Sequence, residues 1–438
     1  MQKLFSFLLL ATILTLGLGV NAQQQMSLKQ AIDIALKNNY DIRLVENAAT
    51  IAKNNNDYGV AGAIPTVAAT GNENKTSSTL EQQYTDPTRN TTKSGVSGTT
   101  VTAGLSASVV LFNGYRIQAT KDRLAAIENQ SNSLLKAQIQ NTTATVMQQY
   151  YNIVRQQVYL GTIQKSIDAS QQRLDIVIAK QKIGVANEAD FLQSSLDLNA
   201  LVQAKQNQLL VIGQAKEDLL NTLAVPSNFV EIHLTDTSLL VDKSLVYQDI
   251  KEKCYQNPTL QSADQQIKIN ALIEKETRAL MYPTLRANTG YNFNSSKSAA
   301  GFSLLNETYG PYVGLNLSIP IYTGGASKKS YKNAKINTTS ANWQYHNLLE
   351  DMLTNTTKTY QSYQTSVKQI PIEEQNYQMS QSLLNLVMQK FQLGQATIVD
   401  VKQAQQSFET AGFRLVSLIY TAKIAEVELK RLSNQLAF

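Results

Sequence analysis

Residues 139–182 read IQNTTATVMQQYYNIVRQQVYLGTIQKSIDASQQRLDIVIAKQK, and the spacing of their apolar side chains decides the fold. An apolar residue returns every seven positions, at Ile139, Val146, Ile153, Leu160, Ile167 and Leu174. Such a repeat keeps one side of a helix against a partner helix and indicates left-handed supercoiling. Because the wider segment 115–182 holds no proline and one glycine, it predicts a single helix about 100 Å long.

The composition argues against an enzyme and against a nucleic-acid-binding protein. Charged residues make up 16% of the 438 residues, below the roughly 25% usual for soluble chains. The net charge of +6 is mild for this length, and no basic patch suggests nucleic acid. Two histidines, the single Cys254 and the lack of a phosphate-loop or metal-ligand spacing predict no catalytic residue, no cofactor and no metal.

Residues 1–22 have the pattern of a signal peptide. Lys3 supplies the positive start, residues 4–20 the apolar run, and Val20-Asn21-Ala22 a small-residue cleavage site. The alternative is a membrane anchor, but the run is short and no charged stop follows it. No later run of 18 apolar residues predicts a spanning helix. An exported chain without disulfides fits the bacterial periplasm or outer membrane.

Two copies of one pattern follow. The first repeat, 23–225, predicts a helix that begins at Ser27 as its N-cap, and a helical pattern that resumes after Asn38-Asn39 and runs to about residue 63. A β-hairpin (66–111), a long helix (114–183) and a shorter helix (185–224) are expected to follow. In the hairpin, apolar residues alternate at 67–71 and 101–111, and the polar segment 72–98 between them predicts a long loop.

A linker, 226–243, with a short strand at 229–234, leads to the second repeat, 244–438. This repeat predicts a helix, a hairpin (284–321), a long helix (325–393) and a final helix (395–436). Gly104, Gly114 and Gly184 match glycines 210 positions later, which are Gly314, Gly324 and Gly394. Periodicity that persists through an internal duplication is typical of a repeated structural unit.

The hairpins predict strands of about 11 residues, which suits tilted strands in an outer membrane. Four strands are too few to close a barrel, and an open edge is not tolerated in lipid, so several copies must share one barrel. The alternative is a soluble four-stranded sheet capped by helices. That alternative leaves unexplained why the hairpins lead into such long helices.

The chain resembles the TolC-like outer-membrane efflux proteins. The matching pieces are SLKQAIDIALKNNYDIR (27–43), the duplicated layout, and GQATIVDV (394–401) with its weaker copy GVANEADF (184–191). The resemblance implies a mainly α protein with a small β part. It also implies a homotrimer with a twelve-stranded outer-membrane barrel and a twelve-helix tunnel through the periplasm. As function it implies an outer-membrane channel for efflux or type I secretion, docked to a periplasmic adaptor and an inner-membrane transporter.

The resemblance also implies a gate at the periplasmic end. Asp400 matches a ring of acidic side chains that narrows the pore, and Asp190 matches a network that holds the pore shut. This chain departs from the family pattern because Gln403 replaces a second acid, Phe391 replaces a tyrosine and Ala396 replaces an arginine. The hydrogen-bonded closure is therefore expected to be weaker. The alternative is that both carboxylates simply favour the first turn of a helix.

The turns between the helices are the expected docking surface for the adaptor. The residues concerned are Ile183, Gly184, Leu393, Gly394 and Thr397. The alternative is that a tight helix turn merely requires glycine. Gly161 and Pro371, also 210 positions apart, predict a shared bend in the two long helices, since both residues disfavour a helix interior. The alternative is drift tolerated where neighbouring helices brace the chain.

A rival reading of the whole pattern is a non-conducting trimeric coiled-coil surface fibre or adhesin anchored in the outer membrane. A fibre would not require two antiparallel helix pairs with matched turns, nor a duplicated hairpin. A periplasmic enzyme on a helical scaffold is a third reading, and no residue pattern points to it.

Overall fold

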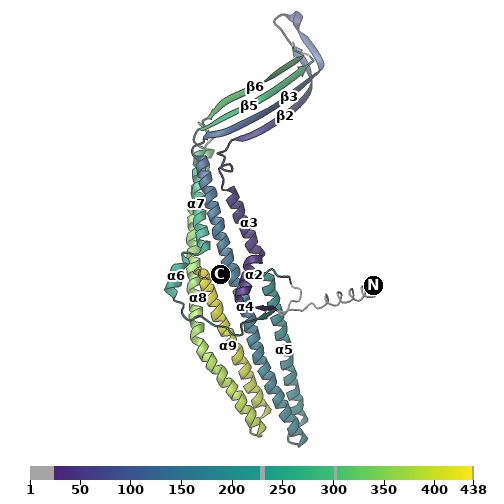
Figure 1. Cartoon of the computed structure of the whole chain (residues 1–438), viewed down its shortest axis with the longest axis vertical. Helices are drawn as coiled ribbons and strands as arrows, with labels where there is room; N and C mark the ends of the chain where they lie inside the picture. Colours follow the sequence, from purple (N-terminus) through teal and green to yellow (C-terminus); the bar gives the residue numbers. More distant parts are fainter. Residues whose placement is uncertain (1–23, 227–231, 300–302, 437–438) are drawn as a thin grey trace, which may run out of the picture. The chain divides into compact units, whose positions relative to one another are not determined.

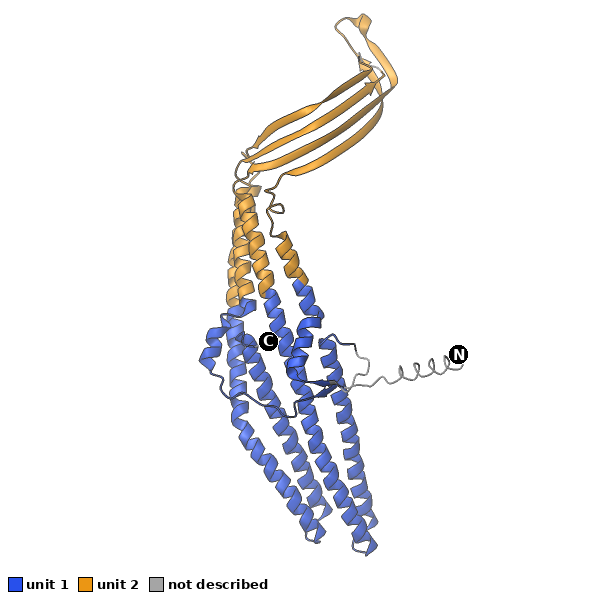
Figure 2. Cartoon of the chain, in the orientation of Figure 1, with its two compact units in different colours: residues 1–46, 134–260, 348–438 blue, residues 47–133, 261–347 orange. Residues whose placement is uncertain are grey.

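A computed structural model describes residues 24–226, 232–299 and 303–436 of the chain. The expected signal peptide, 1–22, lies outside these residues. Two compact units divide the chain (Figure 2): unit 1 comprises 1–46, 134–260 and 348–438, and unit 2 comprises 47–133 and 261–347. Each unit therefore contains parts of both sequence repeats, because equivalent segments of the repeats pack against each other.

Unit 1 is helical. Its elements are α2 (Leu28–Asn38), the start of α3 (Tyr40–Asn55), most of α4 (Arg116–Lys182), α5 (Glu188–Thr222), α6 (Tyr247–Cys254), most of α8 (Ala326–Gln392) and α9 (Ile398–Leu432). The seven-residue repeat of α4 faces the core, where Val146, Tyr150 and Ile153 are fully buried. Ser27 caps α2, as expected, because its hydroxyl accepts a hydrogen bond from the Gln30 amide.

Four helices of unit 1 lie in a row, in the order α5, α4, α9, α8 (Figure 1). Arg173 of α4 pairs with Asp197 of α5. A Cβ added at Gly412 of α9 would lie 2.6 Å from Thr162 of α4. Tyr377 of α8 stacks on Phe408 of α9 with ring centroids 5.2 Å apart. Helices α5 and α8 are consequently the two flanks of the row.

Two asparagines at equivalent places in the repeats connect the junction between two short helices to the C-terminal end of a long helix. Asn39 stands between α2 and α3, where its side-chain oxygen accepts the Asp41 and Ile42 amides and its side-chain nitrogen donates to the Thr222 carbonyl at the end of α5. Asn257 stands between α6 and α7 (Pro258–Ala279) and donates to the Leu432 carbonyl at the end of α9. Each amide satisfies backbone groups at two helix ends.

The described part of the linker, 232–243, is an extended strap across unit 1 (Figure 1). Strand β4 (Ile232–Leu234) forms the end of the strand expected at 229–234, and residues 229–231 lie outside the described residues. It pairs in parallel with β1 (Gln24–Met26), a strand that the sequence pattern did not predict. Further along, the Asp242 amide donates to the buried Glu426 carboxylate of α9, and Lys430 bridges the Asp242 and Glu426 carboxylates. The Tyr363 hydroxyl of α8 donates to the Asp242 carbonyl. The strap is therefore bonded to both α8 and α9.

Unit 2 contains a four-stranded antiparallel sheet in the order β2 (Thr66–Gln82), β3 (Thr91–Phe112), β5 (Thr284–Ser298) and β6 (Leu305–Ser318). The expected polar loop at 72–98 is wrong in its extent, because β2 and β3 stay paired through most of it. Threonine, serine and asparagine continue the ladder because each strand supplies the backbone partners of the other. Within the described residues, β2 pairs only with β3 and β6 only with β5.

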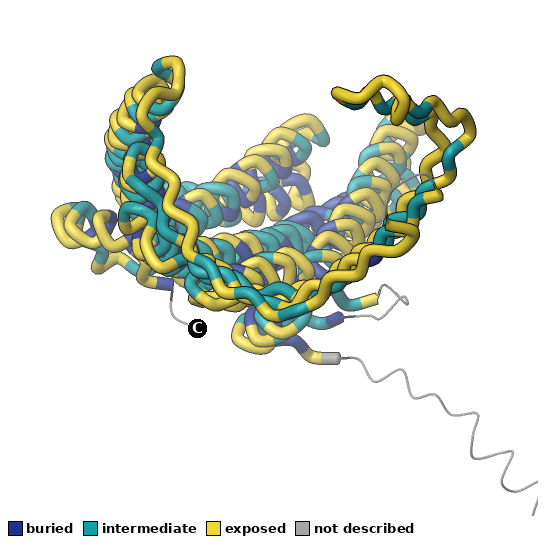
Figure 3. The backbone as a smooth tube through the Cα atoms, turned by 90° about the horizontal axis from the view of Figure 1, so that it is seen from above, coloured by how far each residue is buried: buried dark blue, intermediate teal, exposed yellow. Residues whose placement is uncertain are grey.

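The register places apolar residues on one face of the sheet. Directly paired residues share a face, so Leu105 lies beside Tyr291, which in turn lies beside Pro311. Over most of the length of the strands, this face carries Val67, Ala69, Gly71, Ala103, Leu105, Ala107, Val109, Leu285, Ala287, Thr289, Tyr291, Phe293, Tyr309, Pro311, Val313, Leu315 and Leu317. The next row on the same face, which is Glu73, Val101, Ser295 and Glu307, marks the end of the apolar part. The opposite face carries mainly Thr, Ser, Asn and Gly, and Arg286 gives it a positive charge. Ala68, Val110 and Tyr312 also lie on this face. Seen from above, the strands are mostly exposed or half-buried (Figure 3).

The end of the helix before the first hairpin differs from the expected one. Helix α3 ends at Asn55 rather than near residue 63, and turns follow it, where the Asn56 amide donates to Glu128. Helices α4 and α8 run unbroken through Gly161 and Pro371, both of which are exposed. On the solvent side, proline removes an amide donor at little packing cost. A shared bend at these positions remains a prediction.

Candidate functional site

The two turns at the ends of the helix row have the same backbone. In the first, between α4 and α5, Gly184 has φ of 74°, and the Val185 amide donates to the Lys180 carbonyl. In the second, between α8 and α9, Gly394 has φ of 76°, and the Gln395 amide donates to the Lys390 carbonyl. This left-handed closure favours glycine, which has no Cβ to clash. The glycine match between repeats therefore has a physical cause.

Both candidate gate carboxylates are parts of helix caps. Asp190 forms a reciprocal capping box with Asn187 at the start of α5, and Asp400 forms one with Thr397 at the start of α9. Hydrogen bonds from the Thr397 amide and hydroxyl lower the pKa of Asp400. Asp400 is exposed, so its charge is available to solvent as well as to the cap.

Phe391 lies inside the protein. It is 4% exposed and packs in a cluster with Val177, Val401 and Phe408. The Lys180 ammonium group lies 4.4 Å from the centroid of the Phe391 ring and donates a 2.6 Å hydrogen bond to the Phe391 carbonyl. Lys180 thus ties the first turn to the second. The sequence analysis did not identify this lysine. Its position in the last turn of a helix, where positive charge is favoured, was the one feature that could have pointed to it.

Gln403, the fourth candidate gate residue, is exposed on α9 one turn after Asp400. The structure groups Thr397 with Asp400, and Phe391 with Lys180, but no hydrogen bond joins Gln403 to these side chains within the described part of the chain. Three of the four candidate gate residues therefore belong to separate local groups on one chain, Asp190 with Asn187, Asp400 with Thr397 and Phe391 with Lys180, rather than to one network.

A charged cluster about three turns above the first turn was also missed. The Arg173 guanidinium on α4 is fully buried and donates to Asp197 at 2.9 Å, and Lys402 of α9 lies 2.9 Å from the other Asp197 oxygen. Gln193 also donates to Asp197. Burial lowers the pKa of Arg173, and Asp197 opposes that shift. We call Arg173, Gln193, Asp197 and Lys402 the Asp197 cluster; it connects α4, α5 and α9.

The candidate docking residues present apolar groups to solvent. Ile183 is 75% exposed and Leu393 is 72% exposed, at equivalent places in the two turns. Gly184, Gly394 and Thr397 are also exposed. Large exposed apolar side chains at both turns are typical of a surface that another protein covers.

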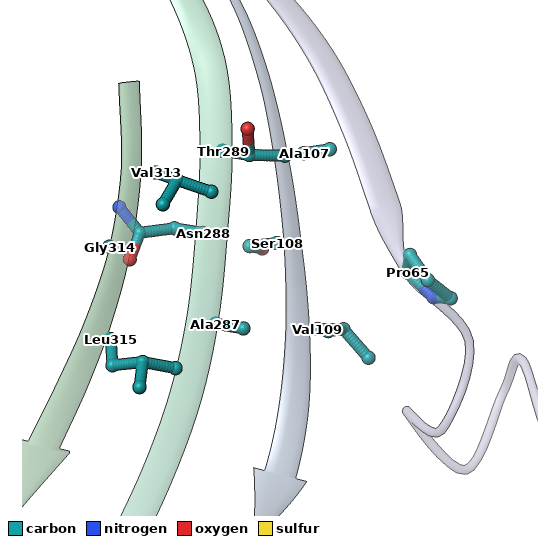
Figure 4. Close-up of a pocket in the computed structure, with 10 residues that line it drawn as sticks. All are labelled: Pro65, Ala107, Ser108, Val109, Ala287, Asn288, Thr289, Val313, Gly314 and Leu315. Carbon is teal, nitrogen blue, oxygen red and sulfur yellow. The ribbon is translucent and has the colours of Figure 1, made fainter.

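The apolar face of the sheet is hollowed. A depression of about 620 Å³ is lined mainly by small and aliphatic residues of β3, β5 and β6, with Pro65 beside them (Figure 4). Val109, Ala287 and Leu315 border it, and Val313 is 86% exposed. No charged side chain lines it. An uncharged aliphatic surface of this kind matches lipid tails better than a polar ligand.

Other kinds of site are absent from the described residues. In the ranges 24–226, 232–299 and 303–436, no group of three or more His, Cys, Asp or Glu side chains could hold a metal ion. None of the helices in these ranges has an apolar window long enough to cross a membrane.

The sequence profile of the outer membrane efflux protein family matches residues 31–224 and 250–435, which is most of the chain and both repeats. The chain belongs to the outer membrane efflux protein family. This confirms the resemblance to TolC-like proteins and the expected location in the outer membrane.

Two TolC proteins are similar to part of the chain. The outer membrane protein TolC of Escherichia coli (strain K12) is 26% identical over 145 residues, and TolC of Salmonella enteritidis is 27% identical over 118 residues. These alignments cover 33% and 27% of the chain, and 29% and 24% of the relatives.

Solved structures with the same fold cover nearly the whole efflux-family chain. The CmeC outer membrane channel of Campylobacter jejuni superposes with a TM-score of 0.78 and 16% identity, over 94% of this chain and 87% of CmeC. The VceC outer membrane protein of Vibrio cholerae gives a TM-score of 0.76 and 16% identity, over 93% and 95%. A membrane protein from Pseudomonas aeruginosa gives 0.76 and 16%, over 93% of both chains. At these identities the likeness shows the fold.

Proposed function

We propose that this protein is the outer-membrane channel of a tripartite efflux or type I secretion system. It would pass small molecules or proteins from an inner-membrane pump to the exterior. The observation that carries the proposal is the sheet, which has an apolar face, a polar face and two unpaired edges. Apolar outside and polar inside is the pattern of a transmembrane barrel that holds water.

The unpaired edges support a homotrimer. Unpaired backbone groups are costly in lipid, so β6 of one copy must pair with β2 of the next. Three copies give twelve strands, and two copies give only eight. Eight strands leave an interior that side chains fill, whereas twelve leave room for a channel.

The flanks of the helix row support the same assembly. On α8, exposed apolar residues recur every seven positions at Ile372, Met379 and Leu386, and Leu393 continues this spacing in the turn that follows the helix. On α5, Leu192, Leu196 and Leu210 are between 52% and 64% exposed. The seven-residue spacing is that of a coiled-coil contact. With α8 of one copy against α5 of the next, three rows of four helices would close a twelve-helix tunnel.

The turns would form the periplasmic end of this tunnel. Three Asp400 carboxylates near the axis would attract cations and repel one another, which is how acidic rings select ions. Asp190 and Gln403 would contribute to the same narrowing, and buried Phe391 would brace it through Lys180. The exposed Ile183 and Leu393 side chains, with Gly184, Gly394 and Thr397, would receive a periplasmic adaptor protein that links the channel to an inner-membrane transporter.

Conductance through planar lipid bilayers tests this function. Purified protein should form stable channels with a preference for cations, and Asp400→Ala should lower that preference. Asp218→Ala, which removes an exposed carboxylate of α5 far from the turns, serves as the matched control and should leave the preference unchanged. Protein that inserts but never conducts would contradict the proposal and favour the surface fibre. Unchanged ion selectivity in Asp400→Ala would remove Asp400 from the narrowest point.

A further inference from the structure

The start of α8 carries a dense group of positive charges. Lys328, Lys329 and Lys332 lie in its first two turns and are exposed, and Lys335 follows one turn later. From residue 308 to residue 349 the sequence contains no aspartate or glutamate. None of the ion pairs found among the described residues involves these four lysines. The group therefore has no counter-charge near it on its own helix, where the first acidic residue is Glu350.

The neighbouring helix does not neutralise these lysines either. On α7, the Glu274 carboxylate accepts a hydrogen bond from Thr338, and Glu276 pairs with Arg123 at 2.6 Å. In the first repeat, by contrast, positive side chains at the matching start of α4 have hydrogen-bond or ion-pair partners. There Lys121 donates to Asn56, and Arg123 has its partner within the protein. The positions that match Lys328, Lys329 and Lys332 are Gln118, Ala119 and Asp122. The fold therefore does not require lysine at these places.

A pocket of about 230 Å³ adjoins the lysines. Pro320, Ile321 and Tyr322 line it together with Ser327 and Lys328. Ile321 and Tyr322 are 95% and 87% exposed. Ile321 also continues the odd-numbered apolar series of β6 that ends in Leu315 and Leu317. The pocket therefore joins the end of the lipid-facing surface to the first positive charges below it.

The dimensions match the headgroup layer of a membrane. From Lys328 to Lys332, a helix rises about 6 Å. The polar layer on each side of a bilayer is roughly 5–7 Å thick. Tyrosine at the boundary, as at Tyr322, is typical of membrane interfaces. Lysines placed just beyond an apolar span attract anionic lipid, about five-fold in affinity for each lysine at the surface.

We propose that Lys328, Lys329 and Lys332, with the pocket at Ile321 and Tyr322, bind the phosphate headgroup of an anionic phospholipid in the inner leaflet of the outer membrane. The apolar part of the pocket receives the start of the acyl chain, and the lysines surround the phosphate. This inference rests on the proposed function, since it requires the apolar face of the sheet to lie in the membrane. It adds a lipid site that the channel function alone does not need.

Native mass spectrometry of the purified protein in detergent tests the site. Phosphatidylglycerol and phosphatidylcholine with identical acyl chains are added in turn, and bound lipid is counted on each assembly. The wild type should retain phosphatidylglycerol at least ten-fold more strongly, and added salt should reduce the difference. Lys328→Gln, Lys329→Ala and Lys332→Gln together should remove the preference. The first two of these substitutions install residues that the first repeat already carries at the same place.

Controls separate the outcomes. Lys358→Gln, Lys368→Gln and Lys390→Gln together change three exposed lysines elsewhere on the same helix and should leave the preference intact. A preference that survives in the Lys328 triple variant overturns the inference. Displacement of phosphatidylglycerol by an equal concentration of inorganic phosphate also overturns it, because the site would then bind a free anion. Trimers without lipid preference contradict only this site, whereas protein without trimers contradicts the proposed function as well.

Discussion

The two helical hairpins of unit 1, α4–α5 and α8–α9, share a backbone but not a pattern of burial. Both end in a glycine with positive φ, and both restart with a capping box. Yet α9 buries fourteen of its 35 residues and α5 only six. The difference follows from position in the row, since α9 has a helix on each side and α5 is a flank. The two hairpins therefore have the same turns, and the number of buried side chains on each helix depends on how many helices pack against it.

The ion pairs differ in the same way, and the largest predicted effect concerns them. Arg173 and Asp197 of the first hairpin correspond to Leu383 and Ser407 in the second. Asp197→Ala leaves a buried guanidinium without a counter-charge and should lower the free energy of unfolding by about 3–5 kcal/mol. Denaturant titration of the purified protein measures it. Asp218→Ala, an exposed aspartate on the same helix, should change the midpoint little, and an equal loss in both variants would contradict the assignment.

The paired asparagines should behave alike, with a smaller loss. Asn257→Ala and Asn39→Ala each leave backbone groups at two helix ends without partners, which costs about 1–3 kcal/mol. Asn257 is 3% exposed and Asn39 is 8% exposed, so the loss at Asn257 should be the larger. The same titration ranks them. A loss at only one position would show that the two junctions are not equivalent.

The two caps provide a matched pair of weaker variants. Thr397→Ala and Asn187→Ala should each cost about 1 kcal/mol, because each removes the side-chain acceptor for an N-terminal amide of a helix. The change should appear as faster amide hydrogen exchange at the start of α9 or α5, respectively. Exchange that accelerates at both starts in either variant would indicate that the two turns unfold together.

A pH dependence should follow from the second cap. The pKa of Asp400 is lowered in the folded protein by hydrogen bonds from Thr397. Asp400 therefore stabilises its turn above the ordinary carboxyl pKa of about 3.9, and this stabilisation is lost as pH falls through the lower folded value. Hydrogen exchange at the start of α9, corrected for intrinsic rates, should accelerate on acidification in the wild type. Asp400→Asn should exchange quickly at every pH, and a matching acid response in that variant would assign the effect to another group.

The smallest effect is expected on the polar face of the sheet. Arg286 would place three positive charges in the barrel, far fewer than a charged lining provides. Arg286→Gln should shift the reversal potential of the channel slightly toward cations, opposite in sign to Asp400→Ala. A shift in the same direction as Asp400→Ala would place Arg286 outside the conducting path.

Much of the fold followed from periodicity, because long helices that pack along one side must repeat apolar residues at fixed intervals. The seam of α4 at Val146 and Ile153 was predictable for this reason. The length of β2 and β3 was not, since Asn, Ser and Thr in residues 72–98 favour turns unless a paired strand is already present. Arg173 was also missed, because its burial depends on Asp197, 24 positions away and on another helix.

We propose that three copies of the chain close one barrel, in which β6 of one copy pairs with β2 of the next. The mass of the detergent-solubilised protein, measured by light scattering with the detergent contribution removed, tests it most directly. We expect a single species of three chains, each at most 48.4 kDa. A monodisperse monomer would contradict the shared barrel, because a four-stranded sheet with two open edges has no other way to satisfy its backbone in lipid.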